Sequence, residues 1–129
     1  MKVLVLSGSI FEEREIKNTL EGLQQIVGGY IEIPFLSREL NENEIDIIIN
    51  EEGKLIEGLE PEIAIISKET NAILDIVYGN CAFASHDAEG NTIELSAEQK
   101  QMVQDKLKTD IVLYNPKTDK HFLVRGLYI

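Results

Sequence analysis

Residues 18–49 read NTLEGLQQIVGGYIEIPFLSRELNENEIDIII, and this stretch decides the fold class. Its first apolar residues recur at helical spacing, at Leu20, Leu23, Ile26 and Val27. Asn18 or Thr19 can cap the first turn, and Gly28-Gly29 supplies a left-handed stop. The pattern therefore predicts a helix over residues 19–27.

Two strands follow this helix. Tyr30 to Phe35 alternates loosely, and Pro34 favours an edge position or the end of the strand because proline cannot donate to a ladder. Ile45 to Ile49 is a second apolar run. The polar, acidic segment Ser37 to Glu44 predicts a turn between them. We therefore expect the two strands to form an antiparallel hairpin.

The flanking segments continue as short strands. Residues 2–6 predict a buried strand that ends at Ser7-Gly8-Ser9, and Ile63 to Ile66 predicts another. Lys68 to Leu74 predicts a helical turn. Asp75 to Ser85 is rich in strand formers but contains Gly79-Asn80, which fits either a type I′ turn or a bulge within one long strand. We favour the bulge, because few residues remain on either side for a hairpin.

The C-terminal region predicts a helix and a hairpin. Ser96 and Gln99 have capping-box spacing for a helix over residues 97–108. Asp110 to Tyr114 and Phe122 to Ile129 flank a strong turn signal. The sequence thus predicts a single α+β domain with a largely antiparallel sheet, two main helices (19–27 and 97–108) and a C-terminal hairpin. We divide it into residues 1–99 and a segment 100–129 that packs on the same domain.

Length and composition limit the number of domains and the cellular compartment that we expect. The 129 residues fit one domain, and 43% hydrophobic residues suffice for a core. The N-terminal apolar run is too short for a signal peptide, and no run approaches the roughly 18 residues of a membrane span. A single cysteine is typical of a reducing compartment. We therefore expect a cytoplasmic protein.

Negative charge is concentrated in the first half of the chain. Residues 1–62 hold 14 acidic and 5 basic side chains, whereas residues 63–129 hold 9 and 7. Such a surface repels nucleic acid and anionic membranes and attracts basic surfaces or cations. We therefore predict no direct binding to nucleic acid or membrane, and an acidic interaction face formed by Glu12, Glu13, Glu15, Glu42, Glu44, Glu51 and Glu52.

The segment after the first strand raises the question of phosphate binding. Val3 to Ser9 resembles the first strand and phosphate loop of flavodoxin-like flavin reductases. Here, however, Ser7-Gly8-Ser9 leads into Phe11-Glu12-Glu13, which sets carboxylates where a phosphate would lie. An ordinary turn at the end of a strand is the better interpretation.

No metal or nucleophile site is predicted either. Asp87, Glu89 and Asn91 have the spacing of half a calcium loop, but Thr92 stands where that loop needs glycine. Cys81 lies in an apolar strand, where a buried thiol is routine. His86 and His121 are the only histidines. We therefore assign no catalytic, cofactor-binding or metal-binding residues, and favour a non-enzymatic protein.

Several segments together resemble an uncharacterised family of phages, prophages and gut bacteria, the domain of unknown function 3846. The resemblance is carried by Asn18 to Glu32, by Asn50-Glu51-Glu52-Gly53-Lys54-Leu55, by Gly58 to Pro61, by Asp75 to Asn80 and by Leu95 to Gln99. It covers roughly residues 1–99. It implies a compact domain encoded by a mobile element, and it implies no activity.

The leading hypothesis is a phage- or prophage-type interaction module whose acidic half docks on a basic host protein, in its sharpest form as a DNA mimic. The alternative is a small-molecule-binding protein or enzyme with a pocket near Ser7–Ser9 and Gly79-Asn80, where glycine permits close approach to a ligand. A third hypothesis is a homo-oligomer that associates through the apolar C-terminal hairpin.

Overall fold

Ten strands form two sheets, and the computed structural model describes all of residues 1–129. Sheet 1 contains β1 (Lys2–Ser7), β2 (Ile10–Glu15), β3 (Ile31–Glu32), β4 (Ile45–Asn50), β7 (Cys81–His86) and β8 (Thr92–Ile93). Sheet 2 contains β5 (Pro61–Ile66), β6 (Ile73–Tyr78), β9 (Thr109–Asn115) and β10 (Lys120–Tyr128). The helices are α1 (Leu20–Val27), α2 (Arg38–Glu42) and α3 (Ala97–Lys106).

Strand pairing is almost entirely antiparallel. Sheet 1 has the order β2-β1-β7-β4-β3, with β8 on β7. Sheet 2 has the order β6-β5-β10-β9, in which β5 and β10 form the one parallel pair. The predicted α+β class with a largely antiparallel arrangement is confirmed, although the strands divide between two sheets.

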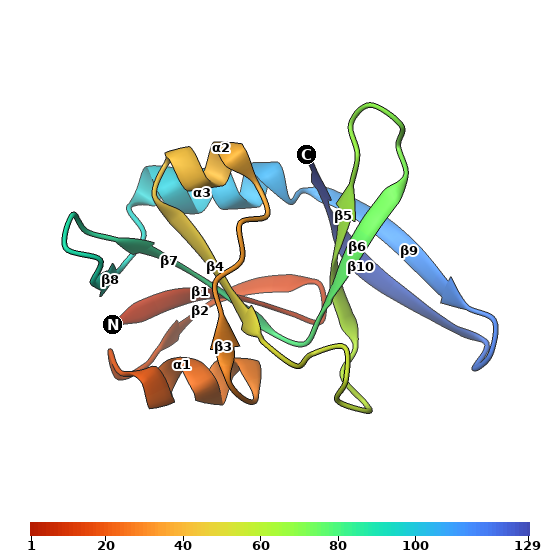
Figure 1. The fold of residues 1–129 in the computed structure, drawn as a ribbon, viewed down its shortest axis with the longest axis horizontal. Helices are drawn as coiled ribbons and strands as arrows, with labels where there is room; N and C mark the ends of the chain where they lie inside the picture. Colours follow the sequence, from red (N-terminus) through yellow and green to blue (C-terminus); the bar gives the residue numbers. More distant parts are fainter.

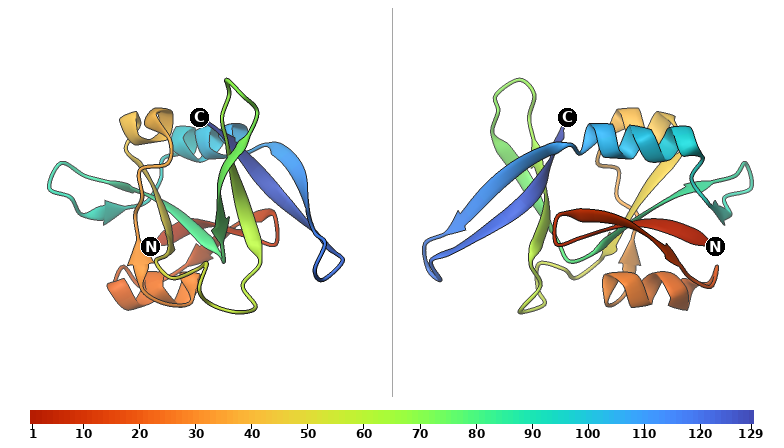
Figure 2. Two further views of the ribbon diagram at one scale, coloured as in Figure 1. Left: turned by 45° about the vertical axis from the view of Figure 1, so that its right-hand side comes forward. Right: turned by 180° about the vertical axis from the view of Figure 1, so that it is seen from behind.

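The chain leaves sheet 1 after β4 to form the β5–β6 hairpin of sheet 2, and it returns to sheet 1 at β7. β4 and β7 are neighbours in sheet 1, and the β5–β6 hairpin between them in sequence belongs to sheet 2. All three helices lie on the sheet 1 side of the molecule (Figure 1). The β9–β10 hairpin, coloured blue, extends away from the body as an arm (Figure 2).

The main core fills the space between the two sheets. Leu6 and Phe83 from sheet 1 belong to the same buried cluster as Ile63 and Leu127 from sheet 2 and Leu107 after α3. These side chains are entirely shielded from solvent. Burial of apolar surface contributes roughly 25 cal/mol per Å². The side chains of this shared core therefore provide the main stabilisation of the contact between the two sheets.

The outer faces of the two sheets differ. Helix α1 covers one face of sheet 1, where Leu23, Ile26 and Val27 pack on Val5 and Ala82. On sheet 2, the smaller outer cluster is formed by strand residues alone, with Ala64, Ile66 and Val124 at its centre. Sheet 1 is therefore covered on both faces, and the outer face of sheet 2 is covered by no helix.

Both predicted main helices are present. Thr19 caps α1, its Oγ1 accepting from the Gly22 amide at 3.1 Å, and Gly28 ends the helix with φ of 81°. Ser96 and Gln99 form the expected capping box of α3. None of the helices has the length and apolar character needed to cross a membrane.

Three local predictions differ from the structure. The polar segment Ser37 to Glu44 contains the short helix α2, because Ser37 caps it and Leu40 packs into the core. Lys68 to Thr70 form a single helical turn, in which the Asn71 amide donates to Ser67 O at 2.8 Å, but β6 already starts at Ile73, so the predicted span to Leu74 was too long. Gly79-Asn80 is not a bulge within one strand, because it carries the chain from β6 in sheet 2 to β7 in sheet 1.

Candidate functional site

The seven carboxylates of the predicted acidic face lie in three separate places: on β2, around the end of α2, and in the loop after β4. Glu12, Glu13 and Glu15 lie on β2, at one edge of the sheet. Glu42 ends α2, and Glu44 follows it. Glu51 and Glu52 follow β4, next to the opposite edge strand β3. The structure therefore brings Glu51 and Glu52 together but separates them from the β2 carboxylates.

The carboxylates on β2 are neutralised within the molecule. Glu12 pairs with Arg14, and Glu13 pairs with Lys100 of α3. Glu15 accepts from the Met1 amine at 2.8 Å. These hydrogen bonds and charges lower the pKa of Glu13 and of Glu15.

The other four carboxylates of the predicted face have weak ion-pair partners or none. Glu42 has Arg38 at 4.0 Å, one helical turn away on an exposed surface. Glu44, Glu51 and Glu52 have no ion-pair partner, since none of the molecule's salt bridges includes them. The unpaired negative charge is therefore found after α2 and, as an adjacent pair, after β4.

Glu51 and Glu52 belong to a loop that is held firmly by Asn50. The buried Asn50 amide donates to Val27 O at 3.1 Å and accepts from the Glu52 amide at 2.8 Å. The Glu51 amide donates to Tyr30 O at 2.9 Å. Because both ends of the Asn50 side chain are occupied, the loop is fixed against the end of α1 and the start of β3.

Glycine permits the close packing on either side of this loop. A Cβ at Gly53 would lie 2.7 Å from the carbonyl oxygen of Tyr78, and one at Gly29 would lie 3.0 Å from the Asn50 amide nitrogen. Gly53 therefore leaves no room for a side chain against the end of β6, and a side chain at Gly29 would push on the Asn50 amide.

Two adjoining hollows flank the loop, and we call them together the Asn50 cleft. The first, of about 350 Å³, lies between β3–β4 and β6 and is lined by Glu32, Glu51, Glu52 and Asp75 around apolar residues that include Leu36 and Val77. The second, of about 610 Å³, lies between the loop and the C-terminal end of α1. Asn50 and Glu52 line both hollows.

The charge in the cleft is negative. Lys54 pairs with Asp75 across its rim, and this hydrogen bond lowers the pKa of Asp75. Glu32, Glu51 and Glu52 have no such partner. Tyr30, whose surface is 67% exposed, lines the second hollow beside Glu52. Unpaired carboxylates next to an exposed aromatic ring are suited to a cation.

The Ser7–Ser9 turn is already occupied by a carboxylate of the protein itself. The amides of Gly8 and Ser9 donate to the two oxygens of Glu62 on β5, at 2.9 and 3.0 Å. Glu62 is only 4% exposed, and its burial raises its pKa despite the two amide donors, which act in the opposite direction. The carboxylate that occupies this anion site thus comes from sheet 2, not from the residues that follow the turn.

Arg125 holds the same turn from the opposite sheet. Its Nε and Nη2 donate to the Ser9 carbonyl at 3.1 and 2.8 Å, and its guanidinium lies 5.5 Å from the ring centre of Phe11. Asp110 lies 3.6 Å from Arg125 on the neighbouring strand. Glu62 and Arg125 therefore tie sheet 2 to the β1–β2 turn, and no sequence signal pointed to either residue.

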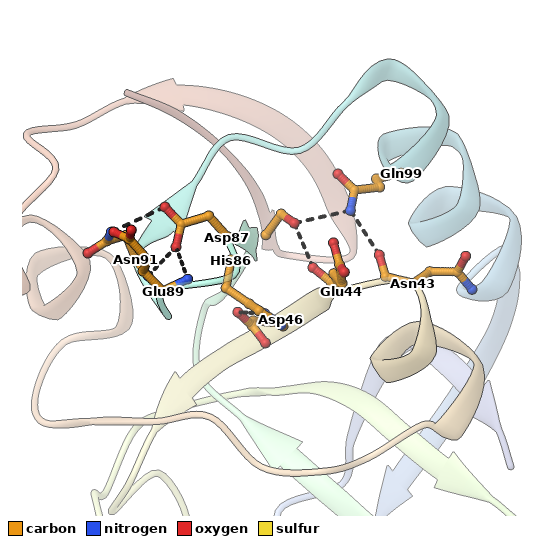
Figure 3. Close-up of polar contacts among 9 residues, drawn as sticks. Asn43, Glu44, Asp46, His86, Asp87, Glu89, Asn91 and Gln99 are labelled. Carbon is orange, nitrogen blue, oxygen red and sulfur yellow. Dashed lines mark hydrogen bonds and ion pairs between the residues drawn. The ribbon is translucent and has the colours of Figure 1, made fainter.

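The polar residues of β7 serve local structure (Figure 3). His86 Nδ1 lies 3.0 Å from an Asp46 oxygen on the neighbouring strand. The Gln99 amide donates to Asn43 O at 2.9 Å and to Ser85 Oγ at 3.1 Å, which joins α3 to the ends of β4 and β7.

The loop that follows β7 is closed by Asp87. Its carboxylate accepts from the backbone amides of Glu89 and Asn91 at 2.9 Å and from the Asn91 side chain at 3.2 Å (Figure 3). These bonds lower the pKa of Asp87. The alternating polar residues thus shape a turn between β7 and β8.

Cys81 is poorly placed for nucleophilic chemistry. The residue is fully buried, and burial, with a smaller contribution from the Glu62 charge, raises the pKa of its thiol. A thiol of this kind remains protonated near neutral pH. His86 pairs with Asp46, and His121 packs on Tyr114 in the arm with ring centres 4.7 Å apart.

Fold and cleft together define a two-sheet α+β domain with an acidic cleft. The model of one family, a domain of unknown function (DUF3846), matches residues 1–108, and the chain belongs to this family. A search of curated proteins and a search of solved structures found no match to the chain.

The two segments that resemble this family most specifically meet at the cleft. Ile31 pairs with Asn50 and Glu32 with Ile49, so residues 28–32 lie beside the start of the segment Asn50–Leu55. Sequence reasoning selected Glu51 and Glu52 but missed Glu32, Tyr30 and Asn50. All five residues lie in the two family-like segments, 28–32 and 50–55. The occurrence of both segments in one chain was the sequence signal that could have located the site.

Proposed function

We propose that this protein is a non-enzymatic interaction module that binds a basic segment of a partner protein in the Asn50 cleft. The observation that carries the proposal is the charge distribution around the loop. Glu32, Glu51 and Glu52 surround a firmly held hollow without cationic partners, whereas the carboxylates of β2 are paired internally. Three unpaired carboxylates of the acidic half thus line one hollow beside β3 and β4.

The shape and lining of the cleft support a lysine or arginine side chain as the bound group. Such side chains have an aliphatic stem and a charged head. Leu36, Ile49 and Val77 line the first hollow and can contact the stem, and the carboxylates that line the same hollow can pair with the charged head. Tyr30 in the adjoining hollow offers a ring face to a second cation.

Binding of an oligolysine and of an oligoarginine peptide, measured by isothermal titration calorimetry, tests the proposal. The double variant Glu51→Gln/Glu52→Gln removes two negative charges from the cleft without changing side-chain size. Exposed ion pairs are worth about 0.2–1 kcal/mol each, so the loss of two should weaken binding roughly 2- to 30-fold. Binding to the unmodified protein should also weaken with added salt.

The matched control is Glu89→Gln/Glu94→Gln, which makes the same change in net charge on exposed residues outside the cleft. It should weaken binding much less than the cleft variant. Equal weakening by both variants would show that the peptide responds only to overall charge, and absence of binding at low salt would overturn the proposal.

A second candidate function is small-molecule binding near Gly8. A hollow of about 420 Å³ lies beside Gly8 and Glu62 and is lined by Lys120 and His121 of the arm. Glu60, whose carbonyl accepts from the Gly79 amide, also lines it. Thermal-shift screening with nucleotides, flavins and divalent cations tests this function, which predicts stabilisation by at least one of them.

We also propose a phage or prophage origin and a cytoplasmic location. The first is supported by the resemblance of residues 18–32 and 50–55 to proteins of mobile elements, and the second by a single cysteine that is buried and unpaired. Phage genes beside the coding sequence, and recovery of the protein in the cytosolic fraction of its host, are the expected results.

A further inference from the structure

β9 is an edge strand without the protection that the other sheet edges carry. Exposed edges invite pairing with another chain, and proteins counter this with charges, short strands, proline or bulges. β9 reads TDIVLYN, with four consecutive apolar residues from Ile111 to Tyr114 and a single charged residue, Asp110. Its outer side has no neighbour in sheet 2.

Each of the other edges has at least one such device. β2 carries four charged residues among its six, and β3 is two residues long. β6, at the opposite edge of sheet 2, pairs with β5 through two register shifts, so its edge is irregular. β9 therefore stands out as the edge that is open, apolar and regular.

We propose that β9 pairs with β9 of a second copy of this chain, so that two copies of sheet 2 join into one continuous antiparallel sheet around a twofold axis. A twofold interface uses the same patch on both subunits and is the most common form of homodimer. With the axis at Val112, Ile111 of one copy lies opposite Leu113 of the other, and Asp110 lies opposite Tyr114.

Charge favours a second copy on this strand over any other part of the surface. Residues 109–129 carry two acidic and three basic side chains, whereas residues 1–108 carry a net charge of −12. Contacts between copies through residues 1–108 would on average set like charges against one another. The arm is thus the segment through which two copies of this acidic chain can associate without strong electrostatic repulsion.

Exposed apolar side chains on the arm also favour a second copy of the chain as the partner of β9. Val112 is 63% exposed, Tyr114 53% and Leu123 51%, and Val112 and Leu123 are direct neighbours across the β9–β10 pair. The antiparallel dimer brings the two copies of Val112 together and places the apolar surfaces of the two arms side by side. The Asn50 cleft is lined by no arm residue and remains free.

Cysteine cross-linking tests the pairing and its register. Directly opposite Cβ atoms on antiparallel strands are about 4.5–5.5 Å apart, close enough for a disulfide after small adjustments. Val112→Cys should give a cross-linked dimer under mild oxidation that reduction reverses. The control Leu74→Cys, on the opposite edge strand β6 and 58% exposed, should remain monomeric on a non-reducing gel. The native Cys81 is buried.

The oligomeric state of uncross-linked protein completes the test. Sedimentation should show a dimer that dissociates to monomer in Val112→Lys but not in Leu74→Lys. Both positions are exposed, so neither change should prevent folding. A monomer at every soluble concentration would overturn the proposal, as would a dimer that Leu74→Lys disrupts and Val112→Lys leaves intact.

Discussion

Sheet 1 and sheet 2 share one core but differ in how much of their remaining surface is covered. Sheet 1 has α1 on one face and the central core on the other, and charged or very short strands at its edges. Sheet 2 has the core on one face, no helix on the other, and an arm that extends from the body (Figure 2). The difference indicates that the shared core and the α1 contacts provide stability, whereas the arm of sheet 2 leaves an edge free for association between copies.

The largest predicted effect comes from the shared core. Phe83→Ala in β7 removes a fully buried ring and should lower the free energy of unfolding by about 3–5 kcal/mol. Leu123→Ala in the arm removes a side chain that is half exposed and should cost well under half as much. Urea denaturation of the two variants measures both values. An equal loss for Leu123→Ala would contradict the assignment of stability to the shared core.

A middle-sized effect is expected at the contact between the sheets. Glu62→Ala leaves the amides of Gly8 and Ser9 without their buried acceptor, which should cost about 1–3 kcal/mol. A single cooperative unfolding transition should remain, because the core still joins the sheets. Two separate transitions in Glu62→Ala would show that this contact, and not the core, couples them.

The pH dependence of the same residue sharpens this test. Burial raises the pKa of Glu62 in the folded state, so its protonated form is favoured by folding. Its contribution to stability is therefore present below the unfolded-state pKa and is lost as pH rises through the folded-state pKa. Glu62→Gln should be less stable relative to the unmodified protein at acidic pH than at neutral pH. Denaturant midpoints of both proteins, measured at each pH, give this difference in stability. A difference that does not change with pH would contradict the raised pKa of Glu62.

The smallest effect should follow removal of an ion pair at the edge of sheet 1. Lys100→Ala leaves Glu13 without its partner, but both side chains are partly exposed. The pair lowers the pKa of Glu13, so its contribution is present above the unfolded-state pKa and is lost as pH falls through the folded-state pKa. The stability difference should therefore disappear at low pH and at high salt. Thermal unfolding under these conditions measures it.

Local sequence signals predicted most of the elements. Gly28 and the Ser96–Gln99 capping box marked the helix ends because caps depend on neighbouring residues only. The division into two sheets was not predicted, because it depends on β10 pairing with β5, some 60 residues earlier in the chain. The turn at Gly79-Asn80 was misread for the same reason, since its role depends on which sheet each strand joins.

The candidate site was predicted in part. Glu51 and Glu52 were selected from charge, but composition alone does not reveal which carboxylates find an internal partner. Lys100 reaches Glu13 across more than 80 residues of sequence, and only the fold shows that no lysine or arginine reaches Glu51 or Glu52. The role of Asn50 was likewise hidden, because its bond to Val27 O joins two residues that lie 23 positions apart in sequence.

The central claim is that a cationic partner binds the carboxylates next to β3 and not those on β2. Titration of ¹⁵N-labelled protein with an oligolysine peptide, followed by NMR, locates the contact on the chain. We predict shift changes concentrated at residues 28–32 and 50–54, with little change along Ile10–Glu15. Changes centred on β2, or spread evenly over all exposed acidic residues, would contradict it.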